Sequence, residues 1–394
     1  MATYDAIVLG GGVIGCSVAY HLTRLRAGRV ALIERSGIAE GTTSQSSGIL
    51  RTHYSVPENV ELARRSFGVF TDFASYLDDP EADCGITLCG YLIIGGEGAQ
   101  ADAIKASLAQ QRAMGISAVE IDLHDARRIL PLLQADDIAV FGYEKDAGFA
   151  DPYLTATSFA RAARRHGATF HLGETVSALV HDGRRVTGVR TDRDTHHAPV
   201  VVSALNVWSN RLLEPLLGTP LPLVAERHEV MALEAPHPYL PTYPVFKDMT
   251  SASMLYARCY GKRQLLASAG REGLVVDPDE PQADVSLDYV AEIGEQVATH
   301  LPAFGEAGVA STWTGLYDVT PDWNPVLGPL PGWDGLVVGF GFAGHGFKLS
   351  PAVGLLLAQA ALGQSTAVSL APYRYGRFAE GQLLVGRYGK GAVS

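Results

Sequence analysis

The stretch Asp5-Ala-Ile-Val-Leu-Gly-Gly-Gly-Val-Ile-Gly15 determines how the amino-terminal part of the chain folds. The four apolar residues before the glycines predict a strand, and the residues after them, to about Arg26, predict a helix. A second apolar run, Val30-Ala-Leu-Ile33, predicts another strand, which ends in Glu34. Strand, tight turn, helix and strand make a βαβ unit, so we expect an α/β fold with a parallel sheet.

The glycines of this turn match a dinucleotide-binding fingerprint. Gly10, Gly12 and Gly15 have the spacing G-x-G-x-x-G, and the acidic Glu34 follows about 20 residues later. The first glycine permits the turn, the second lets a pyrophosphate approach backbone N–H groups, and the third lets helix and strand pack closely. Glu34 would accept hydrogen bonds from the adenosine ribose. The motif alone leaves open whether the dinucleotide carries nicotinamide or flavin.

The composition indicates a small-molecule enzyme. The chain has 394 residues, a formal net charge of −11 and 47% hydrophobic residues. At roughly 100 to 200 residues per domain, this length predicts two domains, each with its own core. Basic residues occur in pairs such as Arg164-Arg165 and not in stripes, which argues against nucleic acid or an anionic membrane as a partner.

The cysteines and the apolar runs indicate a cytoplasmic protein. Four cysteines without a C-x-x-C pair predict reduced thiols, and the amino terminus has no secretory pattern. No apolar run reaches the roughly 18 to 20 residues of a transmembrane helix. His196-His197 could suggest a metal site, but neighbouring residues of a strand point to opposite faces. No carboxylate cluster accompanies them in the sequence, so we expect no metal.

Further helices and strands follow along the chain. Hydrophobic periodicity predicts helices at about 57–77, 100–113, 154–165 and 285–300, and strands at 168–172, 199–202, 224–233, 253–260, 264–269 and 335–340. Asp182-Gly183 predicts the turn of a hairpin. Ser350-Pro351 predicts the start of the last helix, with Ser as N-cap and Pro as first helical residue. The Pro-rich stretch 236–244 predicts a loop over a site.

Two further segments favour flavin. Gly41-Thr-Thr-Ser-Gln-Ser-Ser-Gly48 is a run of small and hydroxyl residues suited to line the pyrophosphate and ribityl chain. Gly339-Phe-Gly-Phe-Ala-Gly-His-Gly-Phe-Lys348 joins a predicted strand to the last helix. Its glycines let the backbone approach a flat ring, and the positive end of the helix would stabilise a reduced, anionic flavin.

With these segments the chain resembles a known group of flavoenzymes, the D-amino-acid oxidase-like superfamily of FAD enzymes. The similar branch contains sarcosine oxidase, dimethylglycine oxidase, glycine oxidase and the FAD L-proline dehydrogenases. The resemblance also rests on Ser47-Gly-Ile-Leu-Arg51, Val202-Ser-Ala-Leu-Asn-Val-Trp208, Gly315-Leu-Tyr-Asp-Val-Thr-Pro-Asp322 and Gly344-His-Gly-Phe-Lys348. It implies a Rossmann-like FAD-binding domain (1–84, 146–220 and 316–394) interleaved with a substrate domain built on an antiparallel sheet (85–145 and 221–315).

The chain departs from this family at three places. Some relatives attach FAD through a histidine or a cysteine, where this chain has Gln45 and Gly315, so we expect non-covalent FAD. Leu205-Asn206 replaces the usual Ala-Gly, and the sequence offers no physical reason for that change. Oxidases of the family place a lysine above the flavin, where this chain has Leu266, with Lys262 nearby. The electron acceptor therefore stays open between O2 and a quinone or protein.

The resemblance also implies the site residues. Arg51 and Lys348 match the clamp that holds the substrate's carboxylate, and Tyr317 and Tyr256 align with tyrosines that face the substrate. The residues predicted to bind FAD are Gly10, Gly12, Val13, Ile14, Gly15, Glu34, Arg35, Thr42, Thr43, Ser44, Ser47, Gly48, Val176, Ala204, Trp208, Gly315, Gly344, His345, Gly346, Phe347 and Lys348.

The activity that the resemblance implies is FAD-dependent oxidation of the C–N bond of a small secondary amino acid. Sarcosine, an N-carboxyalkyl amino acid or proline would transfer a hydride to flavin N5, and the imine would hydrolyse. Alternatives are a D-amino-acid or glycine oxidase or dehydrogenase, a 2-hydroxy-acid enzyme, and a flavoprotein subunit of a multi-subunit amine dehydrogenase with partner subunits. Arg227-His228, Arg258 and Lys262-Arg263 could hold a second carboxylate, although solvated charges on an edge strand are the simpler expectation.

Overall fold

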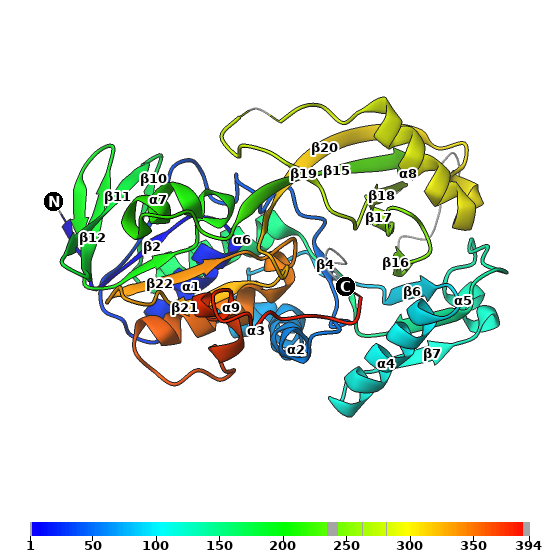
Figure 1. Ribbon diagram of the computed structural model, residues 1–394, viewed down its shortest axis with the longest axis horizontal. Coiled ribbons are helices and arrows are strands. Elements are labelled where there is room, and N and C mark those ends of the chain that lie inside the picture. Colours follow the sequence, from blue (N-terminus) through cyan, green and yellow to red (C-terminus); the bar gives the residue numbers. More distant parts are fainter. Residues whose placement is uncertain (1, 235–242, 262, 281, 389–394) are drawn as a thin grey trace.

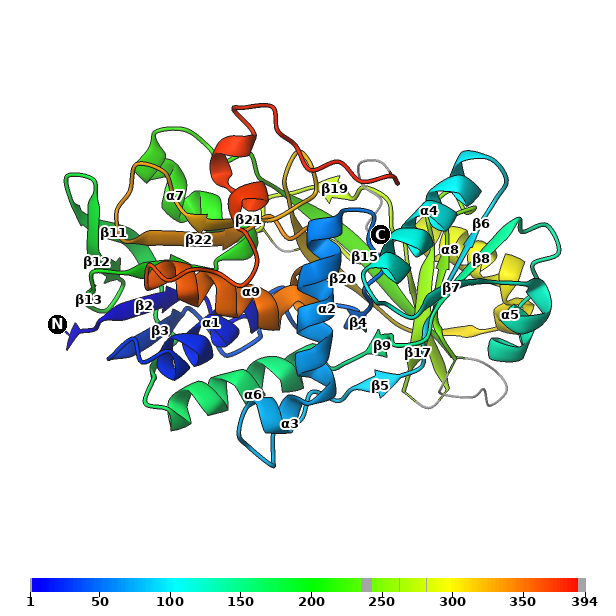
Figure 2. The same ribbon diagram turned by 90° about the horizontal axis from the view of Figure 1, so that it is seen from below.

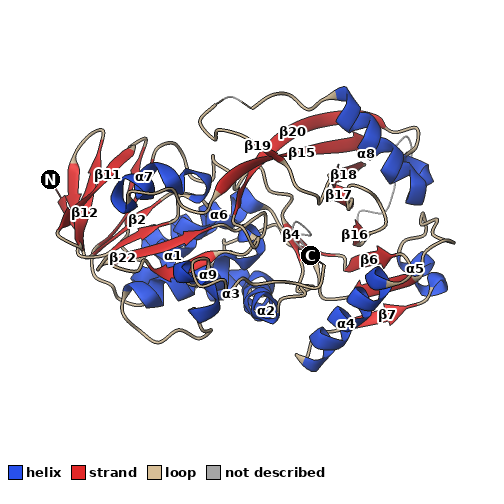
Figure 3. Cartoon of the chain, viewed as in Figure 1, coloured by secondary structure: helices blue, strands red, loops and turns tan. Residues whose placement is uncertain are grey.

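The computed structural model describes residues 2–234, 243–261, 263–280 and 282–388, in which two large sheets lie side by side (Figure 1). One sheet contains the predicted βαβ unit, and the other is mainly antiparallel (Figure 3). Of the Pro-rich stretch predicted as a loop, residues 236–242 lie outside the described residues. None of the helices in the described residues combines the length and the apolar character needed to cross a bilayer.

The first sheet has six strands, of which five run parallel. Their order is β10 (Thr169–Leu172), β3 (Val30–Glu34), β2 (Ala6–Leu9), β14 (Val201–Ser203), β22 (Leu336–Phe340) and β21 (Val326–Pro329). One face packs on α1 (Val13–Arg24) and α9 (Gly346–Ala361), while α6 (Pro152–Arg165) packs on α1, and α2 (Pro57–Thr71) packs on α9 (Figure 2). α3 (Phe73–Tyr76) follows α2 directly.

The other face of this sheet is covered by a smaller sheet and α7 (Ser209–Leu217). The smaller sheet contains β1 (Ala2–Thr3), β13 (Thr195–His197), β12 (Arg185–Thr191) and β11 (Val176–Asp182). β11 and β12 form the predicted hairpin, and Gly183 has the positive φ of 57° that its turn requires. Because apolar side chains cover both faces, the central parallel strands β2, β14 and β22 are buried throughout, whereas the edge strand β10 is partly exposed.

The second large sheet brings together strands from distant parts of the chain. Its order is β19 (Leu274–Val275), β15 (Val224–Glu234), β18 (Gln264–Ser268), β17 (Tyr256–Tyr260), β16 (Val245–Asp248), β6 (Tyr91–Gly95), β8 (Val140–Glu144) and β7 (Ala118–Ile121), and β20 (Gly308–Val319) pairs with β15. α4 (Ala99–Ala113), α5 (Leu123–Ile129) and α8 (Leu287–His300) pack against it. A small sheet of β4 (Ile49–Leu50), β9 (Gly148–Phe149) and β5 (Thr87–Leu88) completes the described strands.

Most predicted elements are present, and their ends have identifiable causes. The helices predicted at 100–113, 154–165 and 285–300 correspond to α4, α6 and α8. Asp151 caps α6, because its carboxylate accepts a hydrogen bond from the Leu154 N–H at 2.9 Å. The helix predicted over 57–77 is interrupted at Asp72, whose φ of −127° is not helical.

The predicted start of the last helix is wrong. α9 begins at Gly346, so Pro351 lies inside the helix and not at its first position. An internal proline loses one backbone hydrogen bond. Against that loss, the earlier start buries Phe347 and Leu349 in the core under the first sheet. Ser-Pro is also the pattern of a helix start, so local sequence could not distinguish the two positions.

Candidate active site

Three connected cavities run between the two large sheets. The outer cavity, of about 1450 Å³, shares Thr42, Thr43 and Ala204 with a middle cavity of about 670 Å³. The middle cavity shares Tyr317 and Gly344 with an inner cavity of about 460 Å³. The three cavities are therefore neighbours, with the glycine turn beside the outer one and Arg51 and Lys348 on the wall of the inner one.

The glycine turn shapes the junction between the outer and middle cavities. Gly10 has a φ of 102°, and a Cβ there would lie 2.6 Å from the Ala204 carbonyl oxygen. A Cβ on Gly15 would collide with the Gly10 carbonyl oxygen, so α1 can start this close to β2 only with glycine. Glu34 accepts hydrogen bonds from the backbone N–H groups of Gly11 at 2.6 Å and Ser36 at 2.9 Å. Its carboxylate is thereby fixed on the wall of the outer cavity.

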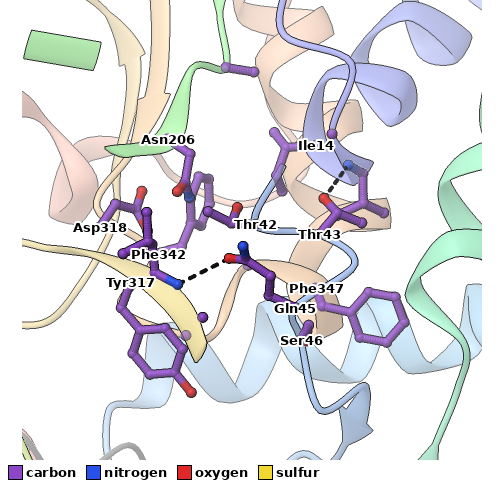
Figure 4. A pocket seen from close by; sticks show the side chains of 17 residues that line it. Ile14, Thr42, Thr43, Gln45, Ser46, Asn206, Tyr317, Asp318, Phe342 and Phe347 are labelled. Atoms are coloured by element: carbon purple, nitrogen blue, oxygen red, sulfur yellow. Dashed lines mark hydrogen bonds between the residues drawn. The ribbon is translucent and has the colours of Figure 1, made fainter. Parts of the chain in front are cut away.

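The hydroxyl-rich loop connects α1 with β20. The Thr43 hydroxyl accepts a hydrogen bond from the Val13 N–H at 3.0 Å, and Gln45 Oε1 accepts one from the Leu316 N–H at 3.1 Å (Figure 4). A Cβ on Gly315 would lie only 3.2 Å from the Gln45 Cβ. The two positions at which relatives of the resembled family attach FAD are therefore neighbours here. Neither one carries a nucleophile.

The backbone conformation at Asn206 accounts for the asparagine that replaces the usual glycine of the Ala-Gly pair. Its φ is 51°, a left-handed conformation that glycine adopts freely and that asparagine tolerates better than most residues. Its buried Oδ1 has no hydrogen-bond partner among the described residues, and it lines the outer and middle cavities. The neighbouring Asp318 accepts a hydrogen bond from the Gly341 N–H at 2.6 Å, and burial raises the pKa of its carboxyl to about 7. An orphaned polar atom in such a wall fits a polar ligand.

Charged and aromatic groups frame the mouth of the outer cavity. The Trp208 indole donates to Asp279 at 2.8 Å, and the Arg35 guanidinium lies 4.1 Å from the centre of its ring. Arg211 forms ion pairs with Asp277 at 2.8 Å and Asp279 at 2.9 Å. The two aspartates were not predicted from the sequence, because they lie in a loop far along the chain from Trp208.

The inner cavity brings together all four residues predicted to contact the substrate. Arg51, Lys348, Tyr256 and Tyr317 line it, and they come from β17, β20, α9 and the segment after β4. The Arg51 guanidinium donates to the His53 carbonyl oxygen. It also lies 4.5 Å from the centre of the Tyr54 ring. These contacts hold the guanidinium in place at the cavity wall.

Lys348 is a buried lysine in the first turn of α9, at the positive end of the helix. Among the described residues, no hydrogen-bond acceptor or carboxylate contacts its ammonium group. Burial and the nearby Arg51 hold the pKa of Lys348 well below its usual range. Burial and Lys348 in turn lower the pKa of His345, which stacks on Tyr54 at 5.1 Å between ring centres and is therefore neutral. An anion in the inner cavity would relieve this concentration of positive charge.

Tyr317 is fixed between an imidazole and a glycine. Its ring centre lies 3.8 Å from that of His228, and a Cβ on Gly344 would lie 2.5 Å from the ring. Burial, followed by the neighbouring Tyr256, raises the pKa of Tyr317 well above its usual value. The phenol therefore stays protonated and can donate a hydrogen bond into the cavity.

The predicted FAD-binding residues are distributed over these cavities. Those that line the outer or middle cavity are Gly10, Gly12, Val13, Ile14, Glu34, Arg35, Thr42, Thr43, Val176, Ala204, Trp208, Gly315, Gly344, Gly346 and Phe347. Ser47 and Lys348 line the inner cavity, and Ser44 lines a separate cavity beside Arg258 and Leu266. Gly15, Gly48 and His345 line none of the four. Lining residues that the prediction missed include Gln45, Ser46, Glu174, Asn206, Leu316, Asp318 and Phe342.

A single carboxylate of the described residues lies beside His196, which the sequence spacing did not indicate. Glu174, between β10 and β11, contacts His196 Nε2 at 2.7 Å and His171 Nδ1 at 3.3 Å, and these three could hold a metal ion. Sequence spacing could not show this, because His171 and His196 lie on strands of different sheets. The Thr191 hydroxyl also donates to Glu174 at 2.6 Å, so hydrogen bonds already satisfy this carboxylate.

Of the basic residues proposed for a second carboxylate, those that the structure describes (Arg227, His228, Arg258 and Arg263) do not line the inner cavity. Arg227 pairs with Glu229 at 3.3 Å. Arg258 is not a solvated edge charge, because β17 is an interior strand and its guanidinium is buried. It donates to the carbonyl oxygens of Ser47 at 2.5 Å and Cys259 at 2.7 Å. Lys262 lies outside the described residues.

The chain is similar to known FAD-dependent oxidoreductases along most of its length. The sequence model of the family described as FAD dependent oxidoreductase matches residues 5–360. FAD-dependent oxidoreductase domain-containing protein 1 of Bos taurus is 28% identical, over 96% of this chain and 85% of that protein. Sarcosine oxidase subunit beta of Arthrobacter sp is 27% identical, over 100% of this chain and 95% of that protein. L-proline dehydrogenase from P.horikoshii shares the fold, with a TM-score of 0.88, 23% identity and coverage of 97% of this chain and 99% of that one.

Proposed function

Because the chain belongs to the family of FAD-dependent oxidoreductases, we propose that it oxidises the C–N bond of a small secondary amino acid in the inner cavity. The observation that carries the proposal is the meeting of Arg51 and Lys348, two buried cations, beside two tyrosines. Such a pair can hold a carboxylate by charge-assisted hydrogen bonds. The glycine turn, Glu34 and the orphaned Asn206 Oδ1 fit FAD along the outer and middle cavities.

In this proposal Arg51 and Lys348 bind the substrate's carboxylate and fix the orientation of the neighbouring C–H bond. The hydroxyls of Tyr256 and Tyr317 would orient the amine. Positive charge in a buried site lowers the pKa of a bound amine, so the neutral, oxidisable form is favoured. The proposal assigns no dedicated base and relies on the orientation of the substrate in the inner cavity. FAD, when bound, supplies the acceptor for the hydride, and water then splits the imine product.

Anaerobic mixing of the purified yellow protein with candidate amines tests the proposal. Sarcosine, other N-methyl amino acids, L-proline, iminodiacetate, glycine and D-alanine are each added while the flavin absorbance is followed. We expect one secondary amino acid to bleach the flavin rapidly. Bleaching by D-alanine or glycine alone would replace the proposed substrate class with a primary amine. Admitting air to the bleached protein then distinguishes O2 from a quinone or protein as acceptor.

The clamp makes a prediction for a single substitution. Arg51→Met keeps an apolar stem but removes the guanidinium, and should weaken substrate binding by about 2 to 5 kcal/mol. That corresponds to a loss of tens to thousands of fold in kcat/KM on the best substrate. Arg128→Met, at an exposed residue of α5, is the matched control and should leave the kinetics unchanged. Equal kinetics for Arg51→Met and the wild type would exclude the clamp.

A second candidate function is that of a catalytic subunit in a larger assembly. It is favoured by the likeness to sarcosine oxidase subunit beta, which extends over the whole of this chain. Gel filtration of the isolated chain, followed by an activity assay of the eluted peak, separates the two. Turnover by a peak of one kind of chain would favour the self-sufficient enzyme, whereas flavin reduction without turnover would favour the subunit.

A further inference from the structure

The inner cavity contains a third basic side chain that the proposed carboxylate clamp does not use. Lys247 lies on β16, and its side chain is only 3% exposed. Its Nζ donates a hydrogen bond to the Met254 carbonyl oxygen at 2.7 Å. A Cβ on Gly270 would collide with this Nζ, so the glycine leaves the room that the ammonium occupies. The ammonium is therefore anchored at a specific point of the wall.

The bond to Met254 leaves part of this ammonium without a protein partner. A lysine ammonium has three N–H donors, and the Met254 carbonyl is the acceptor found for it in the described part of the chain. Asp248, the next residue, binds the Thr250 N–H at 2.8 Å and lies 3.6 Å from His300. Neighbouring strand residues point to opposite faces, so Asp248 does not reach the cavity. Two donors of Lys247 are available to a ligand.

Charge in the inner cavity is unbalanced. Arg51, Lys247 and Lys348 all line it, and its described lining contains no aspartate or glutamate. The carboxyl of Glu144 lies nearby but is bound to Thr52, and it does not line the cavity. Burial and Arg51 lower the pKa of Lys247 to about 7. One carboxylate held between Arg51 and Lys348 would leave Lys247 without an acidic partner in the described lining of the cavity.

Resting on the proposed function, we propose that Lys247 binds a second carboxylate of the substrate. The substrate is then a small dicarboxylic amine, with one carboxylate between Arg51 and Lys348 and the other on the Lys247 ammonium. An N-carboxyalkyl amino acid has this chemistry, because its two acid groups flank the amine. The assignment makes Lys247 a specificity-determining residue for the proposed reaction. It also replaces the basic residues that sequence alone had suggested for this role.

Two redox-inert acids of matched shape test the assignment on the FAD-loaded protein. Glutarate has the chain length of an N-carboxymethyl glycine, and butyrate has the same chain without the second carboxylate. Binding is measured by calorimetry and by the change in the flavin spectrum. We expect the wild type to bind glutarate at least about tenfold more tightly than butyrate. Equal affinity for the two acids would overturn the assignment, and this comparison needs no variant.

Lys247→Met then tests the residue itself, with Lys105→Met as the control at an exposed lysine of α4. We expect Lys247→Met to lose on the order of 30-fold in glutarate affinity, with butyrate affinity unchanged or higher. The control should bind both acids like the wild type. A similar loss for both acids, or a change only in the rate at which O2 reoxidises the reduced protein, would overturn the assignment.

The same titrations separate this inference from the proposed function. Butyrate binding that depends on Arg51 supports the carboxylate clamp, whatever glutarate does. If butyrate binds in this way and glutarate gains nothing, the clamp stands and the second subsite is wrong. If neither acid binds, the clamp and the second subsite are both wrong.

Discussion

Glu144 shows how one buried carboxyl can affect the stability of this protein. Its Oε1 accepts hydrogen bonds from the Thr52 N–H at 2.8 Å and from the Thr52 hydroxyl at 2.7 Å. Its buried Oε2 has no partner among the described residues. Burial raises the pKa of this carboxyl to about 7, although Thr52 and Arg51 act in the opposite direction. The folded protein therefore holds a proton that the unfolded chain releases near its ordinary pKa.

This difference sets the sign of a pH effect. Between the unfolded pKa of about 4.5 and the folded value of about 7, the folded state binds more protons, so rising pH lowers the free energy of unfolding. Glu144→Gln keeps an acceptor for Thr52 and cannot ionise. Between about pH 5 and pH 8 its free energy of unfolding should fall less than that of the wild type, by on the order of a few kcal/mol, and its Tm should fall correspondingly less. Glu120→Gln, at a surface ion pair, is the control. The prediction fails if Glu144→Gln and the wild type lose the same Tm over this range.

Asn206 marks the limit of a comparison made by sequence alone. An asparagine where relatives have glycine looks like a loss of flexibility, yet its φ of 51° shows that the backbone conformation is kept. The change also adds a side chain to the cavity wall. Neither effect follows from the residue type, because both depend on a backbone angle that only the folded chain defines.

At the scale of an element, the start of α1 depends on Gly15. A Cβ at this residue would collide with backbone and not with a flexible side chain, so the helix and the glycine turn would have to separate. Gly15→Ala should lower stability by about 1 to 3 kcal/mol and reduce the FAD content of the purified protein. Gly68→Ala is the matched control in α2, because nothing lies within 4 Å of its added Cβ. It should leave FAD content unchanged and raise stability by up to about 1 kcal/mol. A Gly15→Ala protein with full FAD content and the wild-type Tm would refute this account.

The elements also show which parts of the fold the sequence could predict. β2, α1 and β3 follow one another along the chain, so local periodicity and the glycine spacing were enough to predict the βαβ unit. β16 pairs in parallel with β6, which lies far earlier in the chain. No local pattern reports such a pairing, and for that reason Lys247 was not predicted as a site residue. The start of α9 was wrong because burial of Phe347 outweighs the local Ser-Pro signal.

At the scale of the whole molecule, the cavities are lined by residues of both large sheets. The outer and middle cavities take residues from β3 and the glycine turn of the first sheet, and from β20 of the second. A ligand bound along them therefore contacts both sheets and stabilises the folded state by mass action. Removal of FAD should lower the Tm. FAD at about 100 times its Kd should then raise the free energy of unfolding by about 2.7 kcal/mol, and the Tm should recover accordingly.

We expect removal and rebinding of FAD to be reversible, because Gln45 and Gly315 cannot form a covalent bond with the flavin ring. Acid precipitation of the holoprotein should release all of the flavin into the supernatant, and flavin absorbance of the two fractions measures it. FMN, which lacks the adenosine half, is the control for the outer cavity, where Glu34 and Trp208 lie. It should raise the Tm of the stripped protein less than FAD does. Yellow colour left in the pellet would contradict non-covalent binding, and equal recovery with FMN would mean that the outer cavity does not bind adenosine.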